Sequence, residues 1–466
     1  MRKILCLAFA FLLAFGTLVG AQPANYDVIV VGAGGAGLSA AVEAKDLGAN
    51  VLVIEQMPMV GGNTLRATGG LNAAESTVQK GLGIEDSKGV FFMDVMKGGY
   101  ERNLPQLVWV MVDQAADAVD WLVGLGADLS DVGRLGGSTN NRAHRPTGGA
   151  PVGSHLVQVL HKAVVDRGIE IRLQTKAVEL LTDDGVVIGV QVQGPDGSSY
   201  PVYGQAVVMA TGGFGGNAEL FAKYDPELEG FGTTNHPGAT GQGLMMVEAA
   251  GGQLIQMEQI QTHPTVHPAT SFMITEAVRG NGAILVNRDG RRFVDEISTR
   301  DVVSAAVLEQ EGGTAYLVFD ETVRKSLLAI EQYISMGITI SANSVEALAR
   351  ELAIPADALQ ATIATYNKYV AEGKDLDFGR PDLPRALSQA DYYAIEIGPA
   401  VHHTMGGVAI NTKAQVLGAD GPIPGLYAAG EVVGGVHGGN RLGGNALADI
   451  VVFGRIAGRQ AVMDNK

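Results

Sequence analysis

Apolar runs separated by glycine-rich turns in the first part of the chain predict a parallel sheet covered by helices. Residues 26–31 form an apolar, β-branched run that suits a buried parallel strand, and residues 51–55 form a second. A glycine-rich turn at 32–37 and an apolar helical stretch at 38–47 lie between them. This order of strand, helix and strand indicates a βαβ unit.

Further elements follow along the chain. Helical patterns occupy residues 104–125 and 155–167, where apolar positions recur at helical spacing. Apolar runs at 169–181, 186–193 and 200–210 alternate with turn residues and predict a meander of three strands.

The pattern changes at residues 258–403, where polar loops alternate with mixed helices such as 345–352 and 358–372. A chain of 466 residues is too long for one hydrophobic core. We therefore predict an α/β protein with a Rossmann-like domain, formed by 25–257 and 404–466. An inserted α+β domain at 258–403 interrupts it.

The first 21 residues have the pattern of a secretory signal peptide. A basic pair precedes an apolar run at 4–19, and small residues end the segment at Ala21. A membrane anchor is the alternative, but the run is at the short end of the spanning range and a strand is predicted from Tyr26. We expect export to the periplasm, with the mature protein not integral to the membrane.

The charge and the cysteine content of the chain limit the kinds of molecule to which it could bind. The formal charge of −16 argues against a nucleic-acid backbone or an anionic membrane surface. It suits docking to a basic redox partner, although an acidic balance also simply maintains solubility. The single cysteine, Cys6, lies in the predicted leader, so the mature chain would have no haem attachment or iron–sulfur ligands. If the protein moves electrons, they must arrive from another molecule.

The turn after the first strand has the glycines of a dinucleotide-binding motif. Gly32 allows the tight turn, Gly34 allows a pyrophosphate to approach, and Gly37 allows the helix to pack on the strand. Glu55 ends the second strand, where an acid bonds ribose hydroxyls. Glycine is abundant, at 64 residues, and clusters again at 61–62, 69–70, 212–213 and 425–430. No second complete motif occurs, which favours FAD over a separate NAD domain.

A glutamate and two arginines lie close together in Thr275-Glu276-Ala277-Val278-Arg279-Gly280 and at Arg300. Beside a flavin that supplies hydride, such a set could relay a proton and add hydrogen across a carbon–carbon double bond. Other interpretations are open. Glu276 and Arg279 could be a surface ion pair on a helix. The residues equally allow Arg300 to be an electrostatic clamp, with His263 as the acid.

Longer segments resemble one family. Gln261-Thr262-His263-Pro264-Thr265, residues 273–287, His402-His403-Thr404-Met405-Gly406-Gly407 and residues 434–445 are similar to the soluble fumarate reductases of the flavocytochrome c type. These belong to the fumarate reductase/succinate dehydrogenase flavoprotein superfamily. The resemblance runs from about residue 26 to the C-terminus. It implies an FAD domain interrupted by a mobile cap, with the substrate held between them.

The resemblance also implies roles for individual residues. One carboxylate of fumarate would be held by His402 and Arg441, and the other by His263 and Thr275, with backbone contacts near Glu276 and Gly444. Arg300 would donate the proton, supplied through Arg279 and Glu276. FAD would be bound by Gly32, Gly34, Ala36, Gly37, Glu55, Asn63, Thr64, Gly69, Gly70, Ala177, Thr211, Gly212, His403, Glu431, Ala446 and Leu447.

Three departures from the family, and one unusual loop, refine these expectations. Asn63 stands where the membrane-bound relatives attach FAD to a histidine, so FAD should be noncovalent. The fused haem domain is absent, so we expect a separate multihaem c-type cytochrome as electron donor. Gln242 replaces a common aspartate near the flavin, and the loop with His267 and Pro268 is unusual and close to the presumed substrate.

The sequence thus predicts an exported, FAD-dependent reductase of fumarate, with Arg300 as proton donor. Alternatives are a reductase of another 2-enoate such as methacrylate or acrylate, a flavin oxidase of an amino-dicarboxylate, and a flavin-bearing electron carrier without turnover. No metal site is predicted. Five histidines are assigned only structural roles: His144, His155, His161, His236 and His267.

Overall fold

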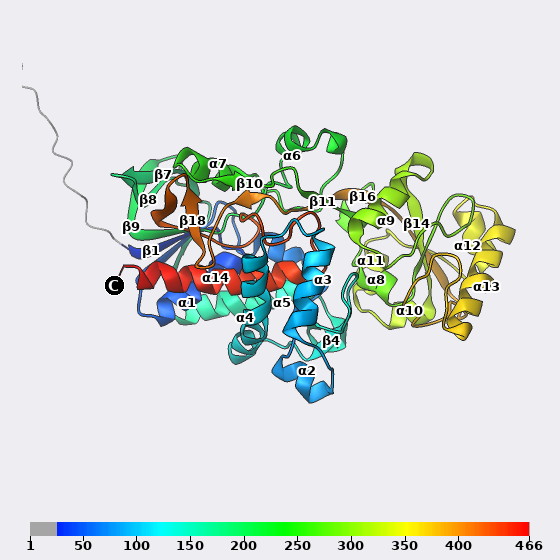
Figure 1. The fold of residues 1–466 in the computed structure, drawn as a ribbon. Coiled ribbons are helices and arrows are strands. Elements are labelled where there is room, and N and C mark those ends of the chain that lie inside the picture. The colour runs from blue at the N-terminus through cyan, green and yellow to red at the C-terminus, as the bar shows by residue number, and fades with distance from the viewer. Residues whose placement is uncertain (1–25, 466) are drawn as a thin grey trace, which may run out of the picture.

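The computed structural model describes residues 26–465, and the predicted signal peptide lies outside this range. The described chain has two hydrophobic cores. The larger contains the βαβ unit and the C-terminal helix, whereas the smaller is made of residues between Ile274 and Ile397. Figure 1 shows them side by side, with the smaller one in green to orange colours. The smaller core falls inside the segment predicted to be a cap, residues 258–403, which we call the capping segment.

The larger core is built around a mainly parallel sheet. Its strands lie in the order β18-β19-β9-β1-β2-β6, and β7 and β8 extend it through β9. Their bounds are β1 Tyr26–Val31, β2 Val51–Ile54, β6 Glu170–Arg172, β7 Lys176–Asp183, β8 Val186–Gln193, β9 Ser199–Met209, β18 Gln415–Gly418 and β19 Gly421–Ala428. This arrangement confirms the predicted α/β class.

Helix α1 (Gly35–Asp46) packs against the sheet and closely against α14 (Asn445–Met463). The close approach depends on small residues. A Cβ at Gly454 would lie 2.5 Å from the Ala36 carbonyl oxygen, and one at Gly458 would lie 2.2 Å from that of Ala40. Helices α4 (Pro105–Gly124) and α5 (Val152–Asp166) cover the outer sides of this pair, near their predicted positions.

The prediction of one continuous strand at residues 169–181 is wrong. The segment forms two strands with different partners, since β6 pairs with β2 and β7 pairs with β8. Gln174, between them, has a φ of 50°, a left-handed conformation that cannot continue a strand. Apolar content alone did not reveal this turn.

The capping segment has its own antiparallel sheet, in the order β12-β11-β16-β14-β13 with β15 on β16. The strands are β11 Ile260–His267, β12 Phe272–Met273, β13 Ile284–Val286, β14 Ala315–Asp320, β15 Ile340–Ala342 and β16 Tyr392–Thr404. Its helices are α8 Ala277–Gly280, α9 Arg300–Leu308, α10 Glu321–Lys325, α11 Ala329–Ser335, α12 Val345–Glu351 and α13 Ala356–Glu372.

Strands β11 and β16 connect the two cores. They pair antiparallel where the chain leaves and re-enters the larger core, with Ile260 opposite Thr404 and Gln261 opposite His403. The two connections therefore bring residues far apart in sequence to one boundary.

Shorter elements complete the described chain: η1 Gly62–Arg66, β3 Leu71–Asn72, α2 Thr77–Leu82, α3 Lys88–Gly98, β4 Asp131–Gly133, β5 Ala143–Arg145, η2 Thr147–Gly149, α6 Ala218–Tyr224, η3 Pro226–Leu228, α7 Gln242–Ala249, β10 Leu254–Ile255, η4 Glu311–Gly313 and β17 Gly407–Val408. Among the helices within residues 26–465, none is both long and apolar enough to span a bilayer.

Candidate active site

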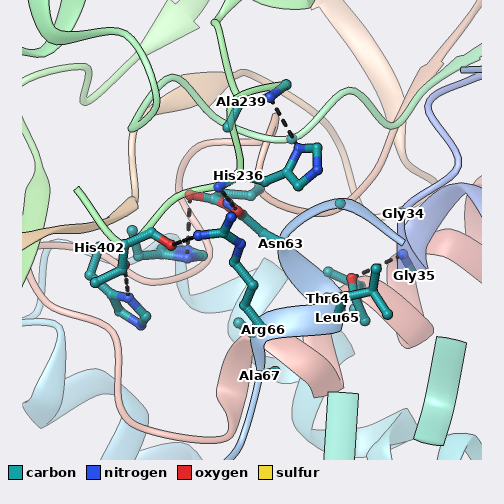
Figure 2. Close-up of a pocket in the computed structure, with 18 of the residues that line it drawn as sticks. Gly34, Gly35, Asn63, Thr64, Leu65, Arg66, Ala67, His236, Ala239 and His402 are labelled. Carbon is teal, nitrogen blue, oxygen red and sulfur yellow. Dashed lines mark hydrogen bonds and ion pairs between the residues drawn. The ribbon is translucent and has the colours of Figure 1, made fainter. Parts of the chain in front are cut away.

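A cavity of about 760 Å³ lies between the two cores. Its walls come from the β1–α1 turn, η1, the loop at 234–240, the start of α14 and the facing residues of the capping segment. Figure 2 shows η1, with Asn63 to Ala67, beside the loop that carries His236 and Ala239. The volume is within the range of cofactor and small-molecule sites.

The glycine motif forms one end of the cavity. Gly32 has a φ of +107°, and a Cβ there would lie 2.3 Å from the Ala210 carbonyl oxygen, so this turn requires glycine. The Glu55 carboxylate accepts hydrogen bonds from the Ala33 and Met57 amides, both at 2.8 Å. Burial raises the pKa of Glu55. Each carboxylate oxygen keeps a free lone pair for a ribose hydroxyl.

The middle of the cavity has room and unpartnered polar groups. A Cβ at Gly62 or Gly212 would meet nothing within 4 Å, and both glycines have positive φ. Thr211 Oγ1 and His403 Nε2 are buried without a hydrogen-bond partner among the described residues. Buried polar atoms normally have partners, so these two suit a polar ligand lying along this wall. The cavity therefore fits an extended dinucleotide such as FAD.

Most predicted site residues line this cavity. All of the predicted cofactor and substrate residues except Gly37 line the cavity. Of the predicted catalytic residues, Arg300 and Glu276 line it, whereas Arg279 does not. Gly37 has a packing position instead, because a Cβ there would lie 1.9 Å from the Gly32 carbonyl oxygen. The adjacent histidines His402 and His403 both line the cavity, although neighbours on a flat strand would face opposite sides.

A polar cluster surrounds Asn63 on η1. Its amide nitrogen donates to Asn235 Oδ1 at 2.6 Å and to Glu431 Oε2 at 3.1 Å, while its oxygen accepts from the His236 amide at 2.7 Å. Glu431 also accepts from the Thr404 amide at 3.1 Å. Burial raises the pKa of Glu431. An asparagine so held has no nucleophilic nitrogen for covalent attachment of a flavin.

Two arginines share one acceptor at the other end of the cavity. The Gln261 side-chain oxygen accepts from Arg300 Nη1 and from Arg441 Nη2, both at 3.1 Å. Its amide nitrogen donates to Asn440 Oδ1 at 2.5 Å and to the Arg441 carbonyl oxygen at 2.8 Å. Burial and the charge of Arg300 lower the pKa of Arg441 to about 9. Gln261 thus fixes the spacing of two cations.

Gln261 was not predicted as a site residue, although it stands in the quoted Gln261-Thr262-His263 motif. Its proximity to His263 was the available signal. Its partners lie 39 and 180 residues away in sequence, so spacing along the chain could not reveal them.

The two predicted substrate histidines face each other across the same end. The ring centroids of His263 and His402 are 5.1 Å apart in an edge-to-face arrangement. Burial lowers the pKa of both well below the usual value, and the nearby arginines lower it further. Both imidazoles are therefore neutral at pH 7. His402 Nδ1 lies 2.7 Å from Thr234 Oγ1, and His263 Nε2 has no partner in the described chain.

Thr275 lies on the capping side of this end, where its amide donates to the Tyr333 hydroxyl at 3.0 Å. Its neighbour Glu276 accepts from the Gly136 amide at 2.6 Å and from Arg300 Nε at 3.0 Å. Although burial acts to raise the pKa of Glu276, Arg300 and Arg279 hold it below its usual value. Glu276 is therefore an ionised carboxylate in direct contact with Arg300.

The surface ion-pair interpretation of Glu276 and Arg279 is wrong. Both side chains are buried, and Glu276 makes its ion pair with Arg300. Arg279 donates Nη1 to the Glu296 carbonyl oxygen at 2.5 Å, while its Nε and Nη2 atoms have no partner within residues 26–465. Burial lowers the pKa of Arg279 to about 10. It acts on Glu276 through charge, behind the cavity wall.

The cavity residues that were not predicted for this site include Arg66, Thr234 and His236. The Arg66 guanidinium donates to the Thr234 carbonyl oxygen at 2.9 Å and so links η1 to the 234–240 loop (Figure 2). Nothing in the local pattern around Arg66 indicates this position. His236 was assigned a structural role, yet its ring lines the cavity and Nδ1 accepts from the Gly238 amide.

In the part of the chain that the structure describes, no group of three or more His, Cys, Asp or Glu side chains is arranged to hold a metal ion. The polar side chains that line the cavity carry guanidinium, carboxylate, imidazole, amide and hydroxyl groups.

Comparison with known proteins agrees with this geometry. A family model described as an FAD binding domain matches residues 27–447. A "Fumarate reductase (cytochrome)" of Shewanella frigidimarina is 54% identical over 96% of this chain and 79% of its own length. An "NADH:fumarate oxidoreductase" of Klebsiella pneumoniae is 47% identical over 95% of this chain and 48% of its own length.

A solved structure of the open conformation of a flavocytochrome c3 fumarate reductase has the same fold. It aligns with a TM-score of 0.80 and 43% identity, over 95% of this chain and 79% of that one. Together with the family match and the cavity, these similarities establish the cofactor and the class of enzyme. The chain belongs to the FAD-binding flavoprotein family that includes the fumarate reductases, and is an FAD-dependent oxidoreductase.

Proposed function

We propose that this protein reduces fumarate to succinate. One observation carries the proposal: at one end of the FAD cavity, Arg300 contacts both Glu276 and Gln261, and Gln261 also holds Arg441. Two cations at fixed spacing, facing two neutral histidines, suit a small planar dicarboxylate. Similarity to fumarate reductases over nearly the whole chain supports the same substrate.

We assign the binding of the two carboxylates to opposite sides of the site. Arg441 and His402 hold one, and His263 and Thr275 hold the other, with backbone groups of Glu276 and Gly444 assisting. Neutral imidazoles donate hydrogen bonds without adding charge, so the arginines supply the attraction for a dianion. A monocarboxylate such as methacrylate would leave one pair without a partner, which favours the dicarboxylate.

Reduced FAD, when bound, supplies hydride to one carbon of the double bond. The residues of this chain orient the substrate and stabilise the negative charge that then develops on the other carbon. Arg300 donates the proton there. An arginine is an unusual acid because its pKa is normally above about 12, so its proton must be replaced promptly. Glu276 is ionised at rest and contacts Arg300 Nε, so it must first take up a proton before it can pass one to Arg300. We assign the buried Arg279, whose charge acts on Glu276, as the source of that proton.

The remaining elements of the proposal concern the setting of the enzyme. Residues 258–403 form a capping domain that covers the substrate, inserted between the two parts of the FAD domain at 25–257 and 404–466. FAD is bound noncovalently, because Asn63 cannot attach it. The protein is exported by its signal peptide to the periplasm, where a multihaem c-type cytochrome delivers electrons for anaerobic respiration.

Anaerobic reoxidation of the reduced, FAD-loaded protein tests the substrate. Fumarate and methacrylate are compared in parallel, with flavin absorbance as the signal. Rapid reoxidation by fumarate and not by methacrylate supports the proposal. Preference for methacrylate would transfer the same chemistry to another 2-enoate. If neither compound reoxidises the flavin, the protein is tested under air with an amino-dicarboxylate. Formation of peroxide would then identify an oxidase, and the absence of peroxide would indicate an electron carrier.

A further inference from the structure

The loop at residues 99–103, between α3 and α4, has an unusual backbone. Tyr100 and Glu101 each have a φ of 56°, a left-handed conformation that residues other than glycine seldom adopt. Two such residues in succession are retained only when the surrounding contacts fix them, and they cluster where position matters to function. The loop therefore presents its side chains in a defined direction.

The contacts that fix this loop come from the segment leading to Arg441. The Gly439 amide donates to the Gly99 carbonyl oxygen at 2.8 Å, and Asn103 Nδ2 donates to the Val436 carbonyl oxygen at 2.9 Å. Asn440 Nδ2 donates to the Gly98 carbonyl oxygen at 3.2 Å. The loop is thus attached to the segment that carries one of the two arginines of the active site.

The opposite side of the loop contacts the capping segment beside the other arginine. The Tyr100 hydroxyl donates a hydrogen bond to Asp301 Oδ2 in the first turn of α9. Asp301 directly follows Arg300, whose guanidinium contacts Glu276 and Gln261. Burial and the bond to Asp301 raise the pKa of Tyr100, so its hydroxyl remains a donor at neutral pH.

The same loop also contacts the strand connection between the cores. Arg102 Nη1 donates to Gln259 Oε1 at 3.0 Å, and its carbonyl oxygen accepts from Gln256 Nε2 at 2.6 Å. These glutamines directly precede β11, where the chain enters the capping segment. One short loop therefore touches the Arg441 segment, the connection between the cores and the start of α9.

We propose that Tyr100 is a positioning residue for Arg300. Through its bond to Asp301, Tyr100 holds the first turn of α9 against the FAD domain, and this contact fixes Arg300 over the substrate. The inference rests on the proposed role of Arg300 as proton donor and adds a residue outside the cavity to that function. Tyr100 does not line the cavity, so its effect reaches the reaction only through the position of Arg300.

The test compares Tyr100→Phe with Tyr203→Phe in the FAD-loaded protein. Tyr203 lies on β9, away from the cavity lining, and serves as the matched control. Tyr100→Phe should lower kcat with fumarate roughly three- to tenfold, the range expected for one hydrogen bond to a partly solvated carboxylate. KM should be unchanged, because Arg441, His402 and His263 do not lie on α9.

A readout independent of turnover is hydrogen–deuterium exchange of peptides covering α9. In Tyr100→Phe, exchange in the first turn of α9 should be faster by roughly the same factor as the fall in kcat, since the lost bond allows local opening. Asp301→Asn keeps an acceptor oxygen without its charge and should show a smaller version of both changes. It also provides the test if Tyr100→Phe does not fold.

Faster exchange in α9 together with lower kcat and constant KM supports the proposal. Unchanged exchange would overturn it, and so would faster exchange with unchanged kcat, because α9 would then move without consequence for Arg300. A wild-type protein that fails to reduce fumarate refutes the proposed function instead. A wild-type protein that is active, with Tyr100→Phe equal to it, refutes only the role of Tyr100.

Discussion

Replacing Arg300 with lysine should remove most of the turnover while FAD stays bound. Arg300 makes two contacts from different nitrogen atoms, Nε to Glu276 and Nη1 to Gln261, at 3.0 and 3.1 Å. The single terminal nitrogen of lysine lacks this planar fork and cannot reproduce both contacts in the same geometry. The variant keeps the positive charge and therefore separates the role of an acid from that of a charge.

The expected size of the effect follows from these contacts. A positioned general acid contributes about 10²–10⁴ in rate, which corresponds to about 3–5 kcal/mol of transition-state stabilisation. Loss of one charge-assisted hydrogen bond alone accounts for about 1.5–3 kcal/mol. We therefore expect kcat to fall at least about a hundredfold, because both the acid and its connection to Glu276 are disturbed.

The assay is fumarate-dependent oxidation of reduced viologen without oxygen, normalised to bound flavin measured by absorbance. Arg288→Lys is the matched control, since Arg288 also lies in the capping segment and pairs with Glu396 at 3.0 Å, with both side chains partly exposed. This control should retain nearly full activity. An Arg300→Lys enzyme within about tenfold of wild type would exclude Arg300 as the acid and leave His263 as the alternative.

Three other predictions concern pH, covalent attachment and the glycine turn. KM for fumarate should be constant between about pH 6 and 8, because His263 and His402 remain neutral there. KM should rise above about pH 9, because Arg441 is charged only below its lowered pKa and then loses its proton. A KM that changes near pH 6.5 would contradict this prediction. Acid precipitation should release all flavin into the supernatant, since Asn63 cannot form the covalent bond, and flavin fluorescence on a denaturing gel would refute it. Gly32→Ala should destabilise the protein by about 2–4 kcal/mol and lower its FAD content, because the new Cβ would lie 2.3 Å from a carbonyl oxygen. Thermal melting measures the stability, and flavin stoichiometry measures the FAD content. A variant with normal stability and normal FAD content would contradict this geometry.

The features that sequence predicts best here are those determined by local geometry. The turn at Gly32 needs a positive φ and a close approach to another strand, and glycine is the residue that meets both requirements. The same holds for the apolar strands β1 and β2, whose burial on both faces removes polar residues from them. Most residues assigned to the cofactor by resemblance do line the cavity, although their individual contacts with FAD stay predictions.

Features that depend on tertiary pairing were missed or misassigned. Spacing suggested a pair between Glu276 and Arg279, three residues apart, yet Glu276 bonds to Arg300 because α9 folds back against β11. The role of Gln261 as a shared acceptor arises only when three distant segments meet. Arg66 has no distinguishing neighbours in sequence, and only the closing of the 234–240 loop over η1 places it in the cavity.

The pairing of β11 with β16 has a mechanical consequence. These two strands are the places where the chain passes between the cores, so any rotation of the capping segment pivots about them. Atoms near an axis of rotation move little, whereas atoms farther away travel in proportion to their distance. His263 and His402 lie on the pivot strands themselves, and Arg300 is bonded to one of these strands through Gln261 at 3.1 Å. A rotation of the capping segment would therefore leave these three side chains nearly in place, and the large displacements would fall on the parts of the segment far from the pivot, such as α13 (Figure 1).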